Sequence, residues 1–222
     1  MTEPQRSLAN NSVAYNVKPT ATELLDEWVS LARNQSGDRG IFNRGGTKYQ
    51  VPERRWKILE RDLATVGTNP CGEIILKSKQ FCNLTEVVAR AEDTEETLLK
   101  KVKLATILGT YQSTLTYFPY LSDEWRKNCE EERLLGVSIT GQWDSPVARR
   151  SETLLKMKEA ALETNKVYAK KFGINESTAI TCVKPSGTVS QLVDAASGMH
   201  PRHSKYYIRR IRITGTDALF QM

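Results

Sequence analysis

Two thiols, a carboxylate and an amide lie close together in the first half of the chain. Cys71 and Glu73 are two positions apart, Asn69 is two positions before Cys71, and Cys82 follows eleven positions after it. Side chains two positions apart point to the same face of an extended segment, so Asn69, Cys71 and Glu73 would meet a ligand together. Residues of these types can carry out radical and redox chemistry.

The residues between these groups predict a rigid loop. Pro70 lacks a backbone donor and has a fixed φ, whereas Gly72 permits backbone conformations closed to other residues. Both residues argue against a helix interior. We therefore expect the loop to present the Cys71 thiol.

Two other interpretations of the cysteines are open at this point. A zinc site usually has four Cys or His ligands in tighter pairs, and the sequence has no close Cys pair or nearby His. Buried, inert thiols are a common state of intracellular cysteines, and single residues do not exclude that state. The surrounding sequence has to decide between them.

A second candidate site follows the β-branched run 177–183, which predicts a strand. The strand would lead into a turn of small residues and then a helix, and such a turn offers free backbone N–H groups and the positive end of the helix dipole to a phosphate. A plain helix cap is the alternative. The spacing is not that of a Walker A loop. The residues that would bind phosphate are Ser186, Gly187, Thr188, Val189 and Ser190.

Several separate segments resemble ribonucleotide reductase large subunits. The segments 69–74 and 81–84 resemble the active-site region of these subunits. Their amino-acid sequence is most similar to that of the adenosylcobalamin-dependent (class II) enzymes. Segments 82–88 and 129–138 resemble the monomeric ribonucleoside-triphosphate reductases in particular. The resemblance runs from about Gln5 to the last residue, with the motifs in the family's order.

The resemblance implies a role for each candidate residue. Cys71 matches the cysteine that becomes a thiyl radical and takes the hydrogen from the ribose 3′ carbon. Glu73 matches the carboxylate that accepts the 3′-hydroxyl proton, and Asn69 the amide that holds the ribose. Cys82 matches one thiol of the pair that reduces the 2′ carbon and becomes a disulfide. Residues 186–190 match the segment that binds the substrate phosphates.

Parts of such an enzyme are missing from this sequence. In the family the partner of Cys82 lies upstream, and Cys129 and Cys182 are interpreted as ordinary structural cysteines. The C-terminal cysteine pair that re-reduces the active site is also absent. Residues 1–222 are therefore expected to be a single, incomplete segment of the catalytic barrel, lacking an N-terminal part and a C-terminal tail, and to be inactive alone.

The implied activity is reduction of ribonucleoside triphosphates to their 2′-deoxy forms for DNA synthesis. It would use adenosylcobalamin as cofactor, a thioredoxin-like protein or another dithiol as reductant, and a chain that supplies the missing barrel half. The alternatives are a non-catalytic fragment, half of a split reductase active only with its partner, or a reductase whose radical comes from a separate metal-cofactor subunit.

Composition narrows the possible locations and partners. Four cysteines without a signal peptide or clustered spacing, and no apolar run near the about 20 residues of a membrane span, predict a cytoplasmic protein without a membrane partner. The net charge of +6 makes nucleic-acid binding a function to consider, and in Lys205–Arg212 basic and aromatic residues are interleaved. No recognised nucleic-acid motif appears, and a nucleotide substrate already explains basic residues, so we expect no nucleic-acid partner. Without carboxylates nearby, His200 and His203 predict no metal site.

Alternating strands and helices predict an α/β fold. The resemblance sharpens this to part of the ten-stranded reductase α/β barrel, in which a finger loop carries the radical cysteine to the centre. No domain boundary is evident. Strands are expected at 12–15, 41–44, 134–140 and 178–183, and helices at 20–33, 52–64, 93–116 and 152–172, the last ended by Gly173.

Overall fold

The computed structural model describes residues 11–34, 39–210 and 213–222. Within these ranges the strands form two-stranded sheets, and helices separate most of them, so the architecture is α/β as predicted. The last two residues of the basic stretch 205–212 lie outside the description. The paired strands are β1 (Asn11–Tyr15) with β2 (Arg39–Asn43), parallel; β3 (Gly67–Thr68) with β4 (Ile75–Leu76), antiparallel; and β5 (Asn83–Val88) with β6 (Leu135–Thr140), parallel.

The helices follow the predicted order with several changes at their ends. The expected helix over 52–64 is divided: the α-helix ends at Leu59, a 3₁₀ helix follows, and Asp62 within it has non-helical dihedral angles. The helical elements are α1 (Ala21–Asn34), η2 (Gly45–Tyr49), α2 (Glu53–Leu59), η3 (Glu60–Thr65), α3 (Glu95–Gln112), α4 (Asp123–Glu132), α5 (Ser151–Phe172), α6 (Val189–Leu192) and α7 (Ala218–Gln221).

Local capping signals account for most of these boundaries. Thr20 and Glu23 form the expected capping box at α1, with the Thr20 N–H donating to Glu23 Oε2 at 2.8 Å. At α3 the box forms between Thr94 and Thr97, and the helix ends four residues before the predicted end. Gly173 ends α5 with a φ of 68°, a left-handed conformation that glycine adopts without strain.

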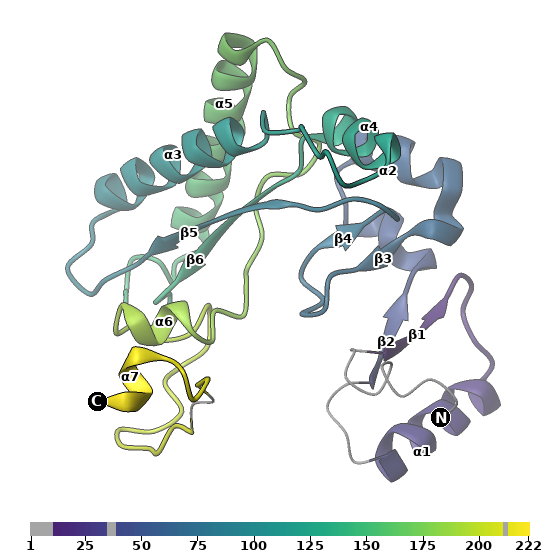
Figure 1. Ribbon diagram of the computed structural model, residues 1–222, viewed down its shortest axis with the longest axis horizontal. Coiled ribbons are helices and arrows are strands. Elements are labelled where there is room, and N and C mark those ends of the chain that lie inside the picture. Colours follow the sequence, from purple (N-terminus) through teal and green to yellow (C-terminus); the bar gives the residue numbers. More distant parts are fainter. Residues whose placement is uncertain (1–10, 35–38, 211–212) are drawn as a thin grey trace.

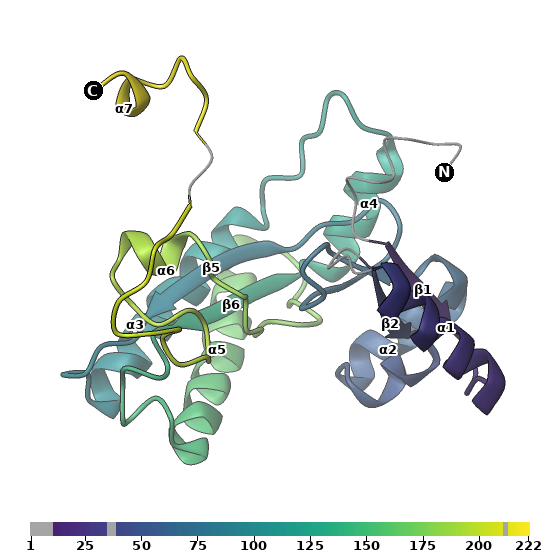
Figure 2. The same cartoon turned by 90° about the horizontal axis from the view of Figure 1, so that it is seen from below.

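The hydrophobic core lies between β5–β6 and the pair of long helices α3 and α5. Both helices pack on one face of this sheet, and Figures 1 and 2 show them side by side there. Val87, Val137 and Ile139 point from the strands into the core, where they meet Leu98 of α3 and Met157 of α5. Side chains alternate along a strand, so the intervening residues face the other way.

The opposite face of β5–β6 carries polar and sulfur-containing side chains. Glu86 and Ser138 point there, and the short helix α6 lies on this side in Figure 2. The helices α3 and α5 therefore supply the scaffold on one face, and the polar side chains and α6 lie on the other.

The segment 178–183 runs beside β6, but it is not the regular strand that we predicted. It makes a single ladder bridge, between Thr181 and Val137. The N–H groups of Leu135 and Val137, two residues apart, donate to carbonyls of Ala179 and Ile180, which are adjacent in sequence. The register slips there, because two residues of β6 span only one of the segment, and this breaks the ladder.

No helix among the described residues is long and apolar enough to cross a membrane.

Candidate active site

The predicted thiol-bearing loop is the tip of the β3–β4 hairpin. Asn69 holds it closed: its N–H donates to Ile74 O at 3.1 Å, and its side-chain oxygen accepts the Ile74 N–H at 3.0 Å. Gly72 has a φ of 81°, the conformation for which glycine is suited. Cys71 is exposed at this tip, so the prediction of a loop that presents the thiol is confirmed.

The reason we gave for Cys71 and Glu73 sharing a face is wrong. The backbone between Asn69 and Ile74 is a tight turn, with the Gly72 N–H bonded to Asn69 O at 3.0 Å, and strand alternation does not apply to it. The two side chains nevertheless come together, because both contact a third residue.

That third residue is Lys184, to which the sequence analysis assigned no role. Its Nζ lies 2.9 Å from Glu73 Oε1 and 3.5 Å from Cys71 Sγ. It comes from the segment that follows residues 178–183, and its backbone N–H donates to Ser138 Oγ of β6 at 2.8 Å. The signal in the sequence that could have indicated this role is a lysine placed directly after an apolar run that ends at a sheet edge.

Glu73 is a buried carboxylate with unused hydrogen-bonding capacity. Its side chain is 8% exposed, and its Oε2 has no hydrogen-bond partner among the described residues. Burial acts to raise the pKa of Glu73, but hydrogen bonds with Lys184 and Asn69 outweigh it and hold that pKa below its ordinary value. Glu73 is therefore ionised at neutral pH, and its second oxygen is buried without a partner among the described residues.

Cys82 lies on the face of the sheet opposite α3 and α5, near Cys182. Burial, followed by the neighbouring Cys182, raises the pKa of Cys82 to about 12. Burial and the charge of Glu73 raise the pKa of Cys182 to about 12. Both sulfurs are therefore thiols at neutral pH. Glu73, Cys82 and Cys182 line one cavity of about 660 Å³.

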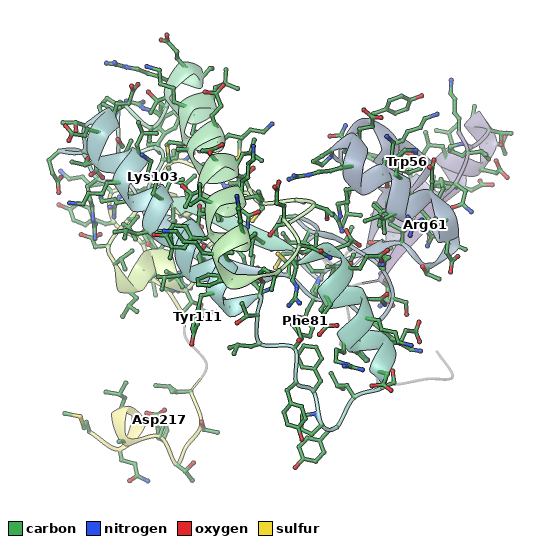
Figure 3. All side chains as sticks on the ribbon, turned by 90° about the horizontal axis from the view of Figure 1, so that it is seen from above. Trp56, Arg61, Phe81, Lys103, Tyr111 and Asp217 are labelled. Atoms are coloured by element: carbon green, nitrogen blue, oxygen red, sulfur yellow. The ribbon has the colours of Figure 1, made fainter. Side chains whose placement is uncertain are left out.

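Aromatic packing fixes the segment that leads to Cys82. The Phe81 ring lies 5.1 Å from that of Phe118 and 6.0 Å from that of Trp125, measured between centroids. Figure 3 shows Phe81 at the base of the loop that leads to α4. This contact restrains the backbone immediately before Cys82.

A buried ion pair holds the hairpin in place. Arg55 Nε donates to Glu132 Oε2 at 2.8 Å, with the two side chains 4% and 0% exposed, and the Arg55 guanidinium also donates to the Ile75 carbonyl of β4. Glu132 accepts two further hydrogen bonds at 2.9 Å, from Gln80 and Thr178. The Arg55–Glu132 pair thus joins α2, α4, the hairpin and the segment beside β6.

The helix at the predicted phosphate site is shorter than expected. Residues Ser186, Gly187, Thr188 and Val189 line a cavity of about 530 Å³ beside β5, but the helix α6 that follows has only four residues. A helix this short contributes little dipole. The Thr188 side chain makes no capping hydrogen bond either, so a plain side-chain cap is not what the motif forms.

Two of the predicted phosphate ligands already have partners. Ser186 Oγ donates to Glu86 Oε2 at 2.8 Å, and Ser190 Oγ donates to Gly187 O at 3.4 Å. Glu86 also places a carboxylate in this cavity. A phosphate bound here would have to displace the Ser186 hydrogen bond and tolerate the carboxylate.

The described residues contain no group of three His, Cys, Asp or Glu side chains able to hold a metal ion. His200 and His203 are exposed, and the His203 ring packs edge-on against Tyr207.

Comparison with a solved structure shows which class of protein the chain resembles. The crystal structure of a B12-dependent (class II) ribonucleotide reductase matches with a TM-score of 0.51 and 30% identity, covering 62% of this chain and 23% of that one. No protein-family model matches the chain. The chain is similar to the class II ribonucleotide reductases, and the resemblance predicted from its motifs is confirmed.

The curated relatives have a more specific name. Adenosylcobalamin-dependent ribonucleoside-triphosphate reductases of Lactobacillus delbrueckii subsp. bulgaricus and Lactobacillus leichmannii are each 30% identical to it over 245 residues. The enzyme of that name from Levilactobacillus brevis is 30% identical over 247 residues. The alignments cover 96% of this chain but 32% of each relative, so the chain spans about a third of their length.

Proposed function

We propose that the chain carries part of the active site of an enzyme that reduces ribonucleoside triphosphates to 2′-deoxyribonucleoside triphosphates, for DNA synthesis. The observation that carries the proposal is the cluster at the hairpin tip, where Lys184 contacts both the exposed thiol of Cys71 and the carboxylate of Glu73. The names of the relatives support the substrate class and the cofactor.

Cys71 begins the reaction. Adenosylcobalamin, when bound, supplies the one-electron oxidation that turns the Cys71 thiol into a thiyl radical. Cys71 is exposed at the tip of its loop, so a large cofactor can reach the sulfur, and in this respect the residues fit the group. The relatives' names favour this cofactor over a separate metal-cofactor subunit. The thiyl radical takes the hydrogen atom from the ribose 3′ carbon.

Glu73 acts as the base for the 3′-hydroxyl. Its free Oε2 accepts the proton while Oε1 stays paired with Lys184 at 2.9 Å. Lys184 keeps the carboxylate ionised and fixes its orientation. Asn69 contributes by closing the loop that positions both reacting groups, and its side chain would also hold the ribose.

Cys82 supplies reducing equivalents to the 2′ carbon. A C2′–OH group and two thiols are converted to C2′–H, water and one disulfide, which balances atoms and electrons. The elevated pKa of Cys82 keeps it protonated, so it can give a proton to the departing hydroxyl. A thioredoxin-like protein or another dithiol would then reduce the disulfide.

Residues Ser186, Gly187, Thr188, Val189 and Ser190 would bind the substrate phosphates. The cavity beside β5 and the proximity of Lys184 support this assignment, whereas the Glu86 carboxylate opposes it. Substrate binding would have to break the Ser186–Glu86 hydrogen bond.

We further propose that residues 1–222 form a single segment of a ten-stranded α/β barrel, with 69–74 as its finger loop. Further polypeptide, in the same chain or a partner chain, would complete the barrel. Two features support this: the sheets of the described residues have only two strands each, and large apolar side chains are exposed, including Leu108, Tyr117 and Leu192.

The test is reduction of CTP in the presence of adenosylcobalamin and dithiothreitol. The chain is assayed alone and after mixing with polypeptides encoded by the flanking reading frames. We expect activity in a mixture, its loss in Cys71→Ser, and its retention in Cys129→Ser, a matched control because Cys129 is buried in α4. Full activity of Cys71→Ser, or inactivity of every mixture, would contradict the proposal.

A further inference from the structure

Lys184 belongs to two parts of the molecule at once. It lines the cavity of about 530 Å³ beside β5, together with residues 186–189, and its backbone N–H donates to Ser138 Oγ of β6 at 2.8 Å. Its Nζ contacts Glu73 and Cys71 at the hairpin tip. The residue therefore spans from the candidate phosphate cavity to the candidate reacting groups.

The ammonium group of Lys184 has hydrogen-bonding capacity left for a ligand. A lysine ammonium carries three N–H donors. One donates to Glu73 Oε1 at 2.9 Å, and a second faces Cys71 Sγ at 3.5 Å. Within the described part of the chain, Nζ makes no third hydrogen bond. The Lys184 side chain is 31% exposed, so a ligand can reach the remaining donor.

The cavity beside β5 needs a positive charge to hold a phosphate. Among the described residues that line it, Glu86 is the only acidic one and Lys184 is the only basic one. The Glu86 carboxylate repels an anion, and the backbone N–H groups of residues 186–189 carry no net charge. Lys184 is therefore the group in this cavity lining that can offset Glu86 for a bound phosphate.

We propose that Lys184 binds the α-phosphate of the nucleotide while it stays paired with Glu73, and so couples phosphate binding to the base. This inference rests on the proposed function, in which the ribose lies at Glu73 and the phosphates lie at residues 186–190. The α-phosphate is joined to the ribose through O5′ and C5′ alone, so it is the phosphate nearest the Lys184 ammonium. A nucleotide that extends from the hairpin tip to the cavity passes this group.

The coupling has a definite sign. The phosphate and Glu73 share one cation, and their own negative charges repel each other. Burial acts to raise the pKa of Glu73, and hydrogen bonds with Lys184 and Asn69 hold that pKa below its ordinary value. A bound phosphate should therefore raise the pKa of Glu73 and make it a stronger base. By linkage, removal of the Glu73 charge should tighten phosphate binding.

The test is binding of cytidine monophosphate, with cytidine as the probe that lacks the phosphate. Both are titrated by calorimetry into the 222-residue chain, alone and mixed with the flanking polypeptides. We expect Lys184→Gln to weaken binding of the monophosphate about tenfold, the size of one hydrogen bond with a charged group, and to leave cytidine binding unchanged. Lys101→Gln is the matched control, because Lys101 is 38% exposed and pairs with the buried Asp93 at 2.6 Å. It should bind the monophosphate like the wild type.

Glu73→Gln supplies a readout that a merely structural role of Lys184 would not move. We expect this variant to bind cytidine monophosphate more tightly than the wild type. In the wild type, the monophosphate should raise the pKa of Glu73 in an NMR titration of the carboxyl carbon. Circular dichroism shows whether each variant keeps its fold.

Four outcomes would overturn the proposal. They are equal losses of monophosphate binding in Lys184→Gln and Lys101→Gln, an equal loss of cytidine binding in Lys184→Gln, weaker monophosphate binding in Glu73→Gln, and no monophosphate binding by any wild-type sample.

The mixed CTP assay distinguishes this inference from the proposed function. If the mixture reduces CTP but Lys184→Gln binds the monophosphate like the wild type, the inference fails and the proposed function stands. If monophosphate binding depends on Lys184 but no mixture reduces CTP, the function fails while the phosphate contact remains.

Discussion

The β5–β6 sheet with its helices and the β3–β4 hairpin are held in place by different interactions. The sheet β5–β6 and the helices α3 and α5 share an apolar core that includes Leu98, Val137 and Ala161. The hairpin β3–β4, which carries Cys71 and Glu73, lies outside that core and is attached by polar contacts, the buried Arg55–Glu132 pair with its hydrogen bonds and the Lys184–Glu73 ion pair. Apolar burial is non-directional, whereas a buried ion pair is stable only in a narrow geometry.

This difference assigns stability to one region and positioning to the other. The apolar core supplies most of the free energy that keeps the sheet folded. The Arg55–Glu132 pair and its hydrogen bonds, here called the polar mount, set where the hairpin places its reactive groups. Changes to the mount should therefore alter the hairpin more than the core, and changes to the core should reduce stability without redirecting the hairpin.

The largest effect is expected for Glu132→Ala. It leaves the Arg55 charge buried without its partner, which costs about 3–5 kcal/mol of the free energy of unfolding. Urea denaturation measures the loss, and hydrogen exchange should show Gly67–Leu76 opening more than Asn83–Val88. Glu131→Ala is the control, because Glu131 is 38% exposed and pairs with Arg61 and Lys77. Equal losses in the two variants would refute the distinct role of the mount.

The next effect is expected for Leu98→Ala in the apolar core. Leu98 is fully buried, and its truncation should lower the free energy of unfolding by about 2–5 kcal/mol through lost burial and a residual cavity. Leu104→Ala on the same helix is the control, since Leu104 is 54% exposed. Hydrogen exchange in the hairpin should change no more than in the rest of the chain, and selective opening of the hairpin would break the comparison.

A smaller effect is expected for Thr94→Ala at the start of α3. Thr94 caps the helix through the Thr97 N–H, and its loss should cost about 0.5–2 kcal/mol in thermal or urea unfolding. Ser122→Ala is a matched control, because Ser122 is the N-cap of α4 but its side chain makes no capping hydrogen bond. If the Ser122 variant loses as much stability, capping does not explain the Thr94 result.

The smallest effect on global stability, and a specific one on the site, is expected for Lys184→Gln. Removing the lysine should raise the pKa of Glu73, which hydrogen bonds from Lys184 and Asn69 now hold below its ordinary value despite burial. An NMR titration of the carboxyl carbon measures this. Lys184→Arg, which keeps the charge, is the control, and an unchanged pKa in Lys184→Gln would show that the ion pair does not control Glu73.

The same ion pair predicts a pH dependence. Because the pKa of Glu73 is lowered in the folded chain, the stabilisation by the pair is present above the unfolded pKa and is lost as pH falls through the folded pKa. The unfolding free energy of the wild type should therefore decline more steeply than that of Lys184→Gln over this acidic range. Identical slopes would show that the pair makes no contribution.

Much of the local structure was predictable because its causes are local. The Thr20–Glu23 box, the Gly173 terminus and the loop containing Pro70 and Gly72 depend on residues a few positions apart. The slipped register of 178–183 was not predictable, because it depends on pairing with β6. The division of the helix near Asp62 was not predicted either. The face shared by Cys71 and Glu73 was predicted for a reason that the turn does not support.

The sequence by itself determined the chemistry available, through the types of Cys71, Glu73 and Cys82 and the relatives that they indicate. Tertiary structure alone decided which distant groups act on them. Lys184 lies 111 positions after Glu73 yet contacts it, and the sulfurs of Cys82 and Cys182 both lie beside Gly136. The physical reason is that capping and turn signals act within a few residues, whereas the burial of β6 between its two neighbours brings together segments that no local pattern connects.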